Sequence, residues 1–348
     1  MLVSDFDFEL PPELIAQAPA GEREAARLLL LDRSSGELGH HQVSDLPDLL
    51  SPGDLLVVND TRVFPARLLG HRVPSGGAVE CLLLKQLDGE RWEALMHPGQ
   101  KLKVGAQVRF EADGGVLEAE VLDRHFHGRR TIRLWSAAGE SVETVVERIG
   151  HVPLPPYIRR PDVGLDRERY QTVYATETGS VAAPTAGLHL TEPLLERLAE
   201  RGVETARVTL HVGYGTFQPI RGDDVEDHRV EAEPYEVPAA TAVAVNRALS
   251  EGRRVVAVGT TTTRTLETAV SSDDRQVRAG TGVSDLYLHP GASFRVLGGL
   301  LTNFHLPRSS LLLLVAAFAG RDRVLDAYSE AVRQGYRFYS YGDAMLIL

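Results

Sequence analysis

The stretch VPLPPY at residues 152–157 divides the chain into two parts with different sequence patterns. Its three prolines favour an extended backbone and a semi-rigid crossing, as in a connection between domains. A chain of 348 residues has room for about two domains of ordinary size. We therefore place a domain boundary close to this stretch.

Before this stretch, residues 66–135 read as short alternating segments separated by turns. VECLLL (79–84) and VLEAEV (116–121) are two such segments, and PSGG (74–77) and DGG (113–115) are two of the turns. Many short strands at regular spacing indicate a small barrel or a sandwich.

After it, predicted strands alternate with predicted helices, which is typical of a sheet covered by helices. We expect strands at 28–31, 55–58, 207–212, 254–258 and 344–348, and helices at 191–201, 239–250, 262–270, from 309 or 310 onward, and at 323–334. The sequence thus predicts an α/β fold with a mixed sheet covered by helices and an inserted all-β barrel. Residues 1–63 plus 152–348 would form the α/β catalytic domain, and 64–151 the inserted β-barrel domain.

The composition excludes several classes of protein. A hydrophobic fraction of 43% with 24% charged residues excludes a wholly disordered chain. The single cysteine, Cys81, excludes an internal disulfide and favours a reducing, cytoplasmic location. The longest apolar run, 311–319, is too short to span a membrane, and the acidic amino terminus lacks an export signal. No histidine–carboxylate motif predicts a metal site.

Four motifs lie where predicted strands meet loops. In VGTTTTR (258–264) an apolar strand runs into a glycine and four threonines at a helix start, where free N–H groups favour a polar ligand. Simple capping of the helix explains this motif equally well. The motifs AAPTAGLHLT (182–191), LHVGYGT (210–216) and LTNFHLP (301–307) each carry a histidine.

These three histidines, His189, His211 and His305, are candidate catalytic residues. Ligand sites in open α/β sheets lie beyond the strand ends, and histidine suits proton transfer near neutral pH. A single histidine of this kind is more often structural. Three of them at the edge of one predicted sheet weaken this structural interpretation.

Three further motifs combine polar groups with cationic or aromatic ones: NDTR (59–62), YQTVY (170–174) and YSYGD (339–343). Aromatic faces can hold a base or a cation. Packing at the strand ends is the alternative, and for each motif alone it is the better one.

Together these segments resemble one family closely, the S-adenosylmethionine:tRNA ribosyltransferase-isomerases of the queuosine pathway. The matching stretches follow the family's order from one end of the chain to the other. They include LLVVNDTRVFPARL (55–68), VAAPTAGLHLT (181–191), VTLHVGYGTFQP (208–219), VGTTTTRTLE (258–267) and LLTNFHLPRSSLLLLVAAFAG (300–320).

The resemblance implies the reaction and its partners. The enzyme would take tRNA with 7-aminomethyl-7-deazaguanine at the wobble position and transfer the ribosyl part of S-adenosylmethionine onto the aminomethyl group, with isomerisation. Epoxyqueuosine in tRNA, adenine and methionine would be the products. S-adenosylmethionine would be a consumed substrate, with no cofactor beside it. We expect a monomer, acting without a membrane.

The resemblance also implies roles for residues. His189, His211 and His305 would carry the proton transfers, without an assignment of base and acid. The substrate-binding candidates are Asp60, Arg62, Tyr170, Thr172, Tyr174, Thr185, Gly213, Gly215, Thr216, Thr260, Thr261, Arg264, Asn303, Tyr341 and Asp343. Because the net charge is −11, tRNA needs a local cationic face. The candidates for it are Arg159, Arg160 and Arg308, with Arg62 and the pair Arg129–Arg130 as further ones.

The sequence departs from the family pattern at some positions. Glu231 stands where a second histidine is expected after His228, and Val283 lies where a Gly-Trp-Thr-Asp stretch is usual. These changes affect local substrate contacts near His228 and Val283 and leave the central loops intact.

Two other functions compete with this one. A methyltransferase would use the same S-adenosylmethionine, but its usual glycine-rich fingerprint after a first strand is absent. A non-catalytic RNA-binding module would explain a barrel with basic turns. It would not explain the clustered histidines and hydroxyls.

Overall fold

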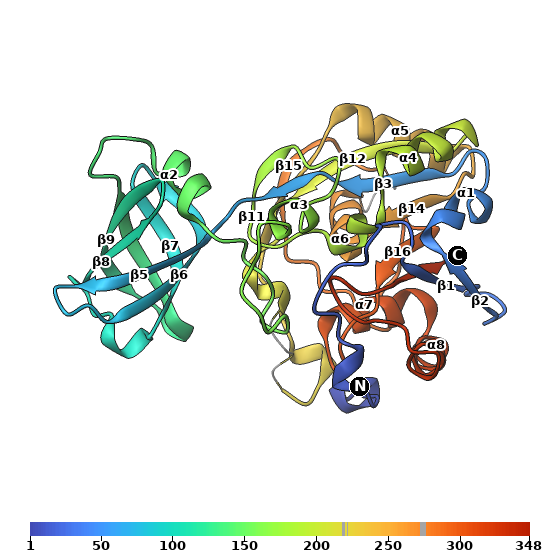
Figure 1. Ribbon diagram of the computed structural model, residues 1–348. Helices are drawn as coiled ribbons and strands as arrows, with labels where there is room; N and C mark the ends of the chain where they lie inside the picture. Colours follow the sequence, from blue (N-terminus) through green and yellow to red (C-terminus); the bar gives the residue numbers. More distant parts are fainter. Residues whose placement is uncertain (218–219, 221, 272–275) are drawn as a thin grey trace.

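The computed structural model describes residues 1–348 except 218–219, 221 and 272–275, and except the side chains of 216 and 217. A small barrel stands apart from a larger body in which helices cover a sheet (Figure 1). The large mixed sheet and the closed all-β barrel confirm the fold class predicted from the sequence.

The large sheet has nine strands, with four neighbouring parallel strands near its middle. Its order is β15 (Gly280–Ser284), β13 (Glu233–Val237), β12 (Glu204–Leu210), β3 (Leu55–Asn59), β14 (Val255–Val258), β16 (Gly299–Asn303), β17 (Ala344–Ile347), β1 (Arg27–Leu31) and β2 (Leu38–Gln42). Strands β12, β3, β14 and β16 are parallel, so their carboxyl ends lie at one edge. Strand β17 runs antiparallel to β16, and therefore its amino end reaches the same edge.

Helices cover both faces of this sheet because buried residues of its strands alternate in direction. Val57 and Ala257 pack in the core shared with α5 (Ala239–Ser250), α6 (Thr260–Ala269), α7 (Ser310–Ala319) and α8 (Arg321–Arg333). Leu56 and Val258 pack in the core shared with α1 (Leu46–Leu49) and α4 (Glu192–Glu200). Among the described residues, no helix is long and apolar enough to cross a membrane.

The barrel closes in the order β10 (Arg129–Trp135), β7 (Arg91–His97), β6 (Ala78–Asp88), β5 (Arg67–Val73), β8 (Gln107–Ala112) and β9 (Gly115–Arg124). All neighbouring pairs are antiparallel, and alternate residues fill the interior. Helix α2 (Val142–Ile149) contributes apolar residues from successive turns to the same core. Closure leaves the sheet without an open edge.

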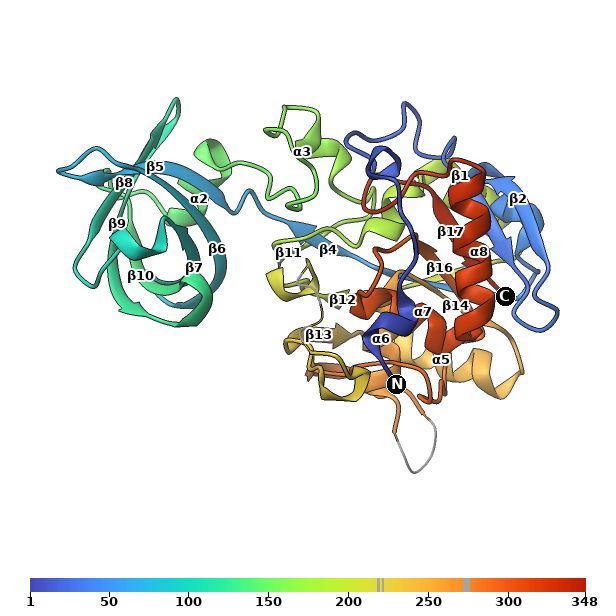
Figure 2. The same cartoon turned by 90° about the horizontal axis from the view of Figure 1, so that it is seen from below.

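The chain enters and leaves the barrel at one place. Arg67 and His151 exchange two backbone hydrogen bonds, with N···O distances of 3.2 and 2.8 Å. On the side of the larger body, β4 (Thr61–Val63) pairs with β11 (Glu177–Ser180) (Figure 2). Helix α3 (Asp166–Arg169) follows the proline stretch. The domain limits at 63/64 and 151/152 stay a prediction, which the pairing of Arg67 with His151 supports.

Candidate active site

Four of the motifs meet at the carboxyl edge of the parallel strands. NDTR begins at the last residue of β3, His211 follows β12, Gly259 follows β14, and Asn303 ends β16. A small pocket of about 40 Å³ lies at this edge. Its lining includes Thr185, Gly259, Thr260, Thr261, Asn303, His305 and Tyr339.

Asn59 holds three of the strand ends in register. Its side-chain amide donates to the carbonyl of Leu210 at 3.0 Å and to the hydroxyl of Thr261 at 3.2 Å. Its Oδ1 accepts from the N–H groups of Leu210 and Thr61, both at 3.1 Å. The amide is fully used, so Asn59 is a scaffold of the site.

The four threonines at the start of α6 divide into two pairs. The hydroxyls of Thr262 and Thr263 donate to backbone carbonyls one turn earlier, at 2.7 and 3.1 Å. Thr260 and Thr261 line the small pocket instead. Gly259, with φ of +91°, makes the turn into the helix in a region that favours glycine. The second pair is thus bonded to backbone carbonyls, and no described side chain caps the helix start, so the capping interpretation fails. The first pair is placed to contact a ligand.

Asn303 lines the small pocket and has an unused acceptor. Its Nδ2 donates to the carbonyl of Tyr339 at 3.0 Å. Its Oδ1 is buried and accepts from no described residue. Leaving a buried acceptor unpaired costs free energy, roughly 1–3 kcal/mol, which a ligand N–H or O–H would recover.

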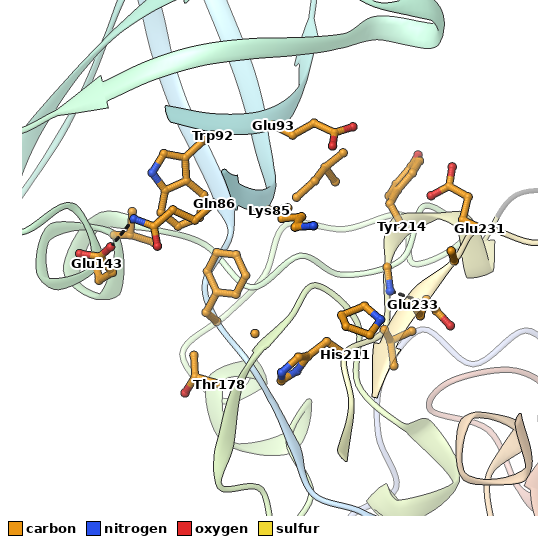
Figure 3. A pocket seen from close by; sticks show the side chains of 18 of the residues that line it. Lys85, Gln86, Trp92, Glu93, Glu143, Thr178, His211, Tyr214, Glu231 and Glu233 are labelled. Atoms are coloured by element: carbon orange, nitrogen blue, oxygen red, sulfur yellow. Dashed lines mark hydrogen bonds between the residues drawn. The ribbon is translucent and has the colours of Figure 1, made fainter. Parts of the chain in front are cut away.

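A larger cavity of about 540 Å³ separates this edge from the barrel. In Figure 3, Trp92, Lys85 and Glu93 of the barrel form one wall, facing His211 and Glu233 of the α/β body. The cavity and the small pocket share Val212 in their linings, so the two spaces adjoin. Together they offer room for a nucleoside next to a pocket rich in hydroxyl groups.

His211 is the histidine that faces the large cavity. Its Nδ1 lies 2.8 Å from the hydroxyl of Thr61, and no described residue hydrogen-bonds its Nε2. The ring packs on Gly179, where a Cβ would come within 2.8 Å of it. Burial lowers the pKa of His211, so the ring is neutral at pH 7 and ready to accept a proton.

The other two histidines occupy different surroundings. His305 lines the small pocket, its Nε2 is 2.9 Å from the hydroxyl of Thr302, and burial lowers its pKa to about 3. His189 has a carbonyl oxygen 3.0 Å from each ring nitrogen, those of Ala186 and Gly342. It lines a separate pocket beyond the loop. The structure thus brings His211 and His305 to adjoining spaces and places His189 between two loops.

Comparison with known proteins agrees with this geometry. The family model described as queuosine biosynthesis protein matches residues 3–347. Proteins named S-adenosylmethionine:tRNA ribosyltransferase-isomerase from Moorella thermoacetica and Symbiobacterium thermophilum are 51% and 52% identical to the chain, over the whole of both sequences. The chain belongs to this family.

A solved relative supports the assignment. The crystal structure of S-adenosylmethionine tRNA ribosyltransferase from Thermotoga maritima is 38% identical, with a TM-score of 0.55. The match covers 99% of this chain and 100% of the other. The resemblance seen in the sequence is therefore confirmed, and the chain is an enzyme of the ribosyltransferase-isomerase family.

Arg264, one of the predicted substrate-binding residues, is already paired in this family member. Its buried guanidinium forms an ion pair with Glu233 and donates to the carbonyls of Leu286 and Ser284, at 3.1 and 3.0 Å. Glu233 also accepts from the N–H of Gly213 at 2.8 Å. The arginine thus positions the Gly-x-Gly turn through Glu233.

Several other substrate-binding candidates already have protein partners. Tyr341 donates to Asp166 at 2.8 Å, and Asp343 accepts from the N–H groups of Arg27 and Arg337 at 3.1 and 2.7 Å. Asp60 accepts from the hydroxyl of Thr209 at 2.7 Å, and burial raises its pKa.

The YQTVY motif is buried against the loop that carries His189. Tyr170 packs edge-on against Tyr341, with ring centroids 5.8 Å apart. The hydroxyls of Thr172 and Tyr174 are buried and have no described hydrogen-bond partner. Both side chains crowd Gly187, where a Cβ would lie 2.2 Å from the Tyr174 hydroxyl.

The remaining candidates of this group spread over different places. Gly213 lines the large cavity, and Gly215 lines a further pocket beside Glu231. Arg62 is exposed. Thr216 lies in a short 3-10 helix, and its side chain is outside the described part of the structure.

The arginines proposed for tRNA differ in availability. Arg159 is exposed, whereas Arg160 donates two hydrogen bonds to Asp166, at 2.7 and 2.8 Å. Arg308 forms an ion pair with Asp7. In the barrel, Arg130 is buried.

Arg129 joins the barrel to the α/β body. It pairs with Glu93 at 3.0 Å and also with Glu231, one of the departures from the family pattern. Glu231 thus takes part in a contact across the cavity.

The barrel wall of the cavity was not predicted from the sequence. Lys85, Trp92, Glu93 and Glu143 all line it. The pairing of β6 with β7 changes register between Leu83 and Lys85, so alternation counted along the strand fails at this point. The described residues contain no group of three or more His, Cys, Asp or Glu side chains suited to a metal ion.

Proposed function

We propose that the chain transfers and isomerises the ribosyl moiety of S-adenosylmethionine onto 7-aminomethyl-7-deazaguanine at the tRNA wobble position. The products are epoxyqueuosine in tRNA, adenine and methionine. The observation that carries this proposal is the position of His211 on the wall of a 540 Å³ cavity, beside a hydroxyl-lined pocket, with no described hydrogen-bond partner for its Nε2.

The chemistry needs a base at this place. The sulfonium of S-adenosylmethionine withdraws electrons, so a C5′ proton becomes removable. In our proposal the Nε2 of His211 takes that proton, and Thr61 fixes the ring through Nδ1. Opening of the sugar then expels adenine, which takes up a proton on leaving. The deprotonated aminomethyl group attacks the opened sugar, and methionine departs as the epoxide closes.

The small pocket suits the polar ends of S-adenosylmethionine. Thr260 and Thr261 stand at the first turn of α6, where free N–H groups favour an anion. Asn303 offers its unpaired Oδ1 to an N–H of the ligand. His305, neutral and bonded to Thr302, completes this wall. The pocket would take a polar end of S-adenosylmethionine, and the rest of this consumed substrate would lie in the adjoining cavity of about 540 Å³, with no further cofactor.

In this proposal His189 is a positioning residue. Both of its ring nitrogens already face carbonyl oxygens of the loops that carry Ala186 and Gly342. We further propose that the enzyme acts on tRNA as a cytoplasmic monomer. The buried free thiol of Cys81, which suits a reducing compartment, supports the location.

The experiment is a product analysis with purified protein, S-adenosylmethionine and tRNA that carries the aminomethyl base. We expect free adenine and the mass of epoxyqueuosine in the digested tRNA. S-adenosylhomocysteine would instead indicate a methyltransferase. Binding of tRNA without either product would favour a non-catalytic RNA-binding module.

A further inference from the structure

The barrel is the least acidic part of the chain. Residues 64–151 contain twelve Lys or Arg and twelve Asp or Glu, so the net charge of −11 falls on the rest. The three lysines of the sequence, Lys85, Lys101 and Lys103, all lie in this part. A phosphate backbone is therefore repelled least on the barrel.

Two neighbouring loops carry Lys101, Lys103 and Arg124 at one end of the barrel. Residues 97–103 and 124–128 include no Asp or Glu. Lys101, Lys103 and Arg124 are all exposed. The buried Arg130 ties the loops together, because it follows the second loop and donates to the carbonyls of Gly99 and Leu102 in the first, at 2.6 and 3.2 Å.

An aromatic ring projects from the second loop. Phe126 is 88% exposed, the largest value among the exposed large hydrophobic residues described. The backbone turns directly after it through His127 and Gly128, with φ of 56° and 83°. Proteins bind single-stranded RNA with this combination, because bases stack on the exposed ring and cations contact the phosphates.

This loop ends at the rim of the large cavity. Arg129, the first residue of β10, follows Gly128 and lines the cavity together with Lys85 and Glu93. A base placed in the cavity would therefore have its neighbours in the RNA strand near Phe126.

We propose that Lys101, Lys103, Arg124 and Phe126, which we call the basic turn, bind the anticodon loop. Phe126 stacks on a base next to the wobble nucleotide, and the three cations contact the flanking phosphates. This proposal rests on the proposed function, which brings the wobble base into the cavity.

The test measures tRNA affinity and steady-state kinetics for Phe126→Ala, with Leu87→Ala as control. Leu87 is 45% exposed and lies at the end of β6. That end pairs with the start of β7 at Arg91, whereas the loop 97–103 follows the other end of β7. We expect Phe126→Ala to raise Kd and KM for tRNA roughly 5- to 20-fold, with kcat and the KM for S-adenosylmethionine unchanged. Phe126→Trp should restore the affinity.

A second pair of variants tests the cations. Lys101→Ala/Lys103→Ala should weaken tRNA binding and reduce the slope of log Kd against log salt by about 1.5. Arg91→Ala/Arg133→Ala removes two exposed cations that face each other on β7 and β10, at the ends of these strands far from Lys101 and Lys103. This variant should leave that slope as it is.

The outcomes separate the two proposals. Equal tRNA affinity and KM for Phe126→Ala and Leu87→Ala, in an enzyme that makes epoxyqueuosine, would overturn the basic turn and leave the function intact. A change in sedimentation coefficient without a change in tRNA affinity would make the turn a contact between copies of the chain, and would also overturn it. Weaker binding by the variants, with no product from the wild type, would support the turn and refute the function.

Discussion

The buried ion pair between Arg264 and Glu233 gives the sharpest prediction on stability. Both side chains are at most 8% exposed, and the arginine makes two further hydrogen bonds to carbonyls. Glu233→Gln keeps the volume and one acceptor but removes the negative charge. Two unit charges about 4 Å apart interact by about 4 kcal/mol at an effective dielectric constant of 20. Breaking a buried pair typically costs 3–5 kcal/mol.

We therefore expect Glu233→Gln to lower the free energy of unfolding by about 3 kcal/mol. The control is Glu204→Gln, which weakens the partly exposed pairs of Glu204 with Arg247 and Arg253 and should cost less than about 1 kcal/mol.

Urea unfolding followed by two probes locates the effect. Trp92 and Trp135, the two tryptophans, both lie in barrel strands, so their fluorescence follows the barrel. Circular dichroism at helical wavelengths follows mainly the α/β body, which contains the longer helices. Glu233→Gln should shift the second transition more than the first. A loss equal to that of Glu204→Gln would refute the reasoning.

Three further predictions follow from the same contacts. Because the pKa of His305 is lowered to about 3, the unfolded chain binds a proton between pH 6.5 and 3 that the folded chain does not, so the free energy of unfolding decreases as the pH is lowered. On going from pH 7.5 to pH 5, His305→Gln should therefore gain about 2 kcal/mol of stability relative to wild type. A difference in urea midpoints that stays the same at both pH values would contradict this. Gly187→Ala places a Cβ 2.2 Å from the Tyr174 hydroxyl and should lower the free energy of thermal unfolding by roughly 1–3 kcal/mol. The control Gly139→Ala places its Cβ in open space and should cost less despite the positive φ of Gly139. Equal losses would argue against crowding at Gly187. Because burial lowers the pKa of His211, kcat/KM for tRNA should fall on the acid side with an apparent pKa below 6.5, and a midpoint above 6.5 would exclude His211 as the base.

Much of the fold follows from the sequence, because local signals suffice for it. Apolar runs such as Val255–Val258 gave strands. The helix expected at 191–201 is capped by Thr191, whose hydroxyl accepts from the N–H of Leu194 at 3.1 Å. The motifs after β3, β12, β14 and β16 meet because parallel strands bring their carboxyl ends together. Strands β2, β13 and β15 were missed, since their short polar sequences carry little periodicity.

The roles of individual site residues depend on tertiary partners that spacing cannot reveal. His189 and His211 look alike in sequence, yet one lies between two carbonyl oxygens and the other faces a cavity. Arg264 follows the threonines as a ligand residue would, but Glu233, 31 residues earlier, pairs with it. The role proposed for Phe126 depends on the position of Arg129 at the cavity rim, which the sequence alone does not reveal.

In the proposed mechanism His211 is the base of a ribosyl transfer at this cavity. The most direct measurement is single-turnover release of adenine from S-adenosylmethionine, with saturating modified tRNA, by wild type, His211→Gln and His41→Gln. His41 lies on β2 at the far edge of the sheet, so it controls for loss of an imidazole. We predict that His211→Gln releases adenine roughly 100-fold more slowly at unchanged tRNA affinity, and that His41→Gln matches wild type. Adenine release by His211→Gln at the wild-type rate would exclude His211 as the base.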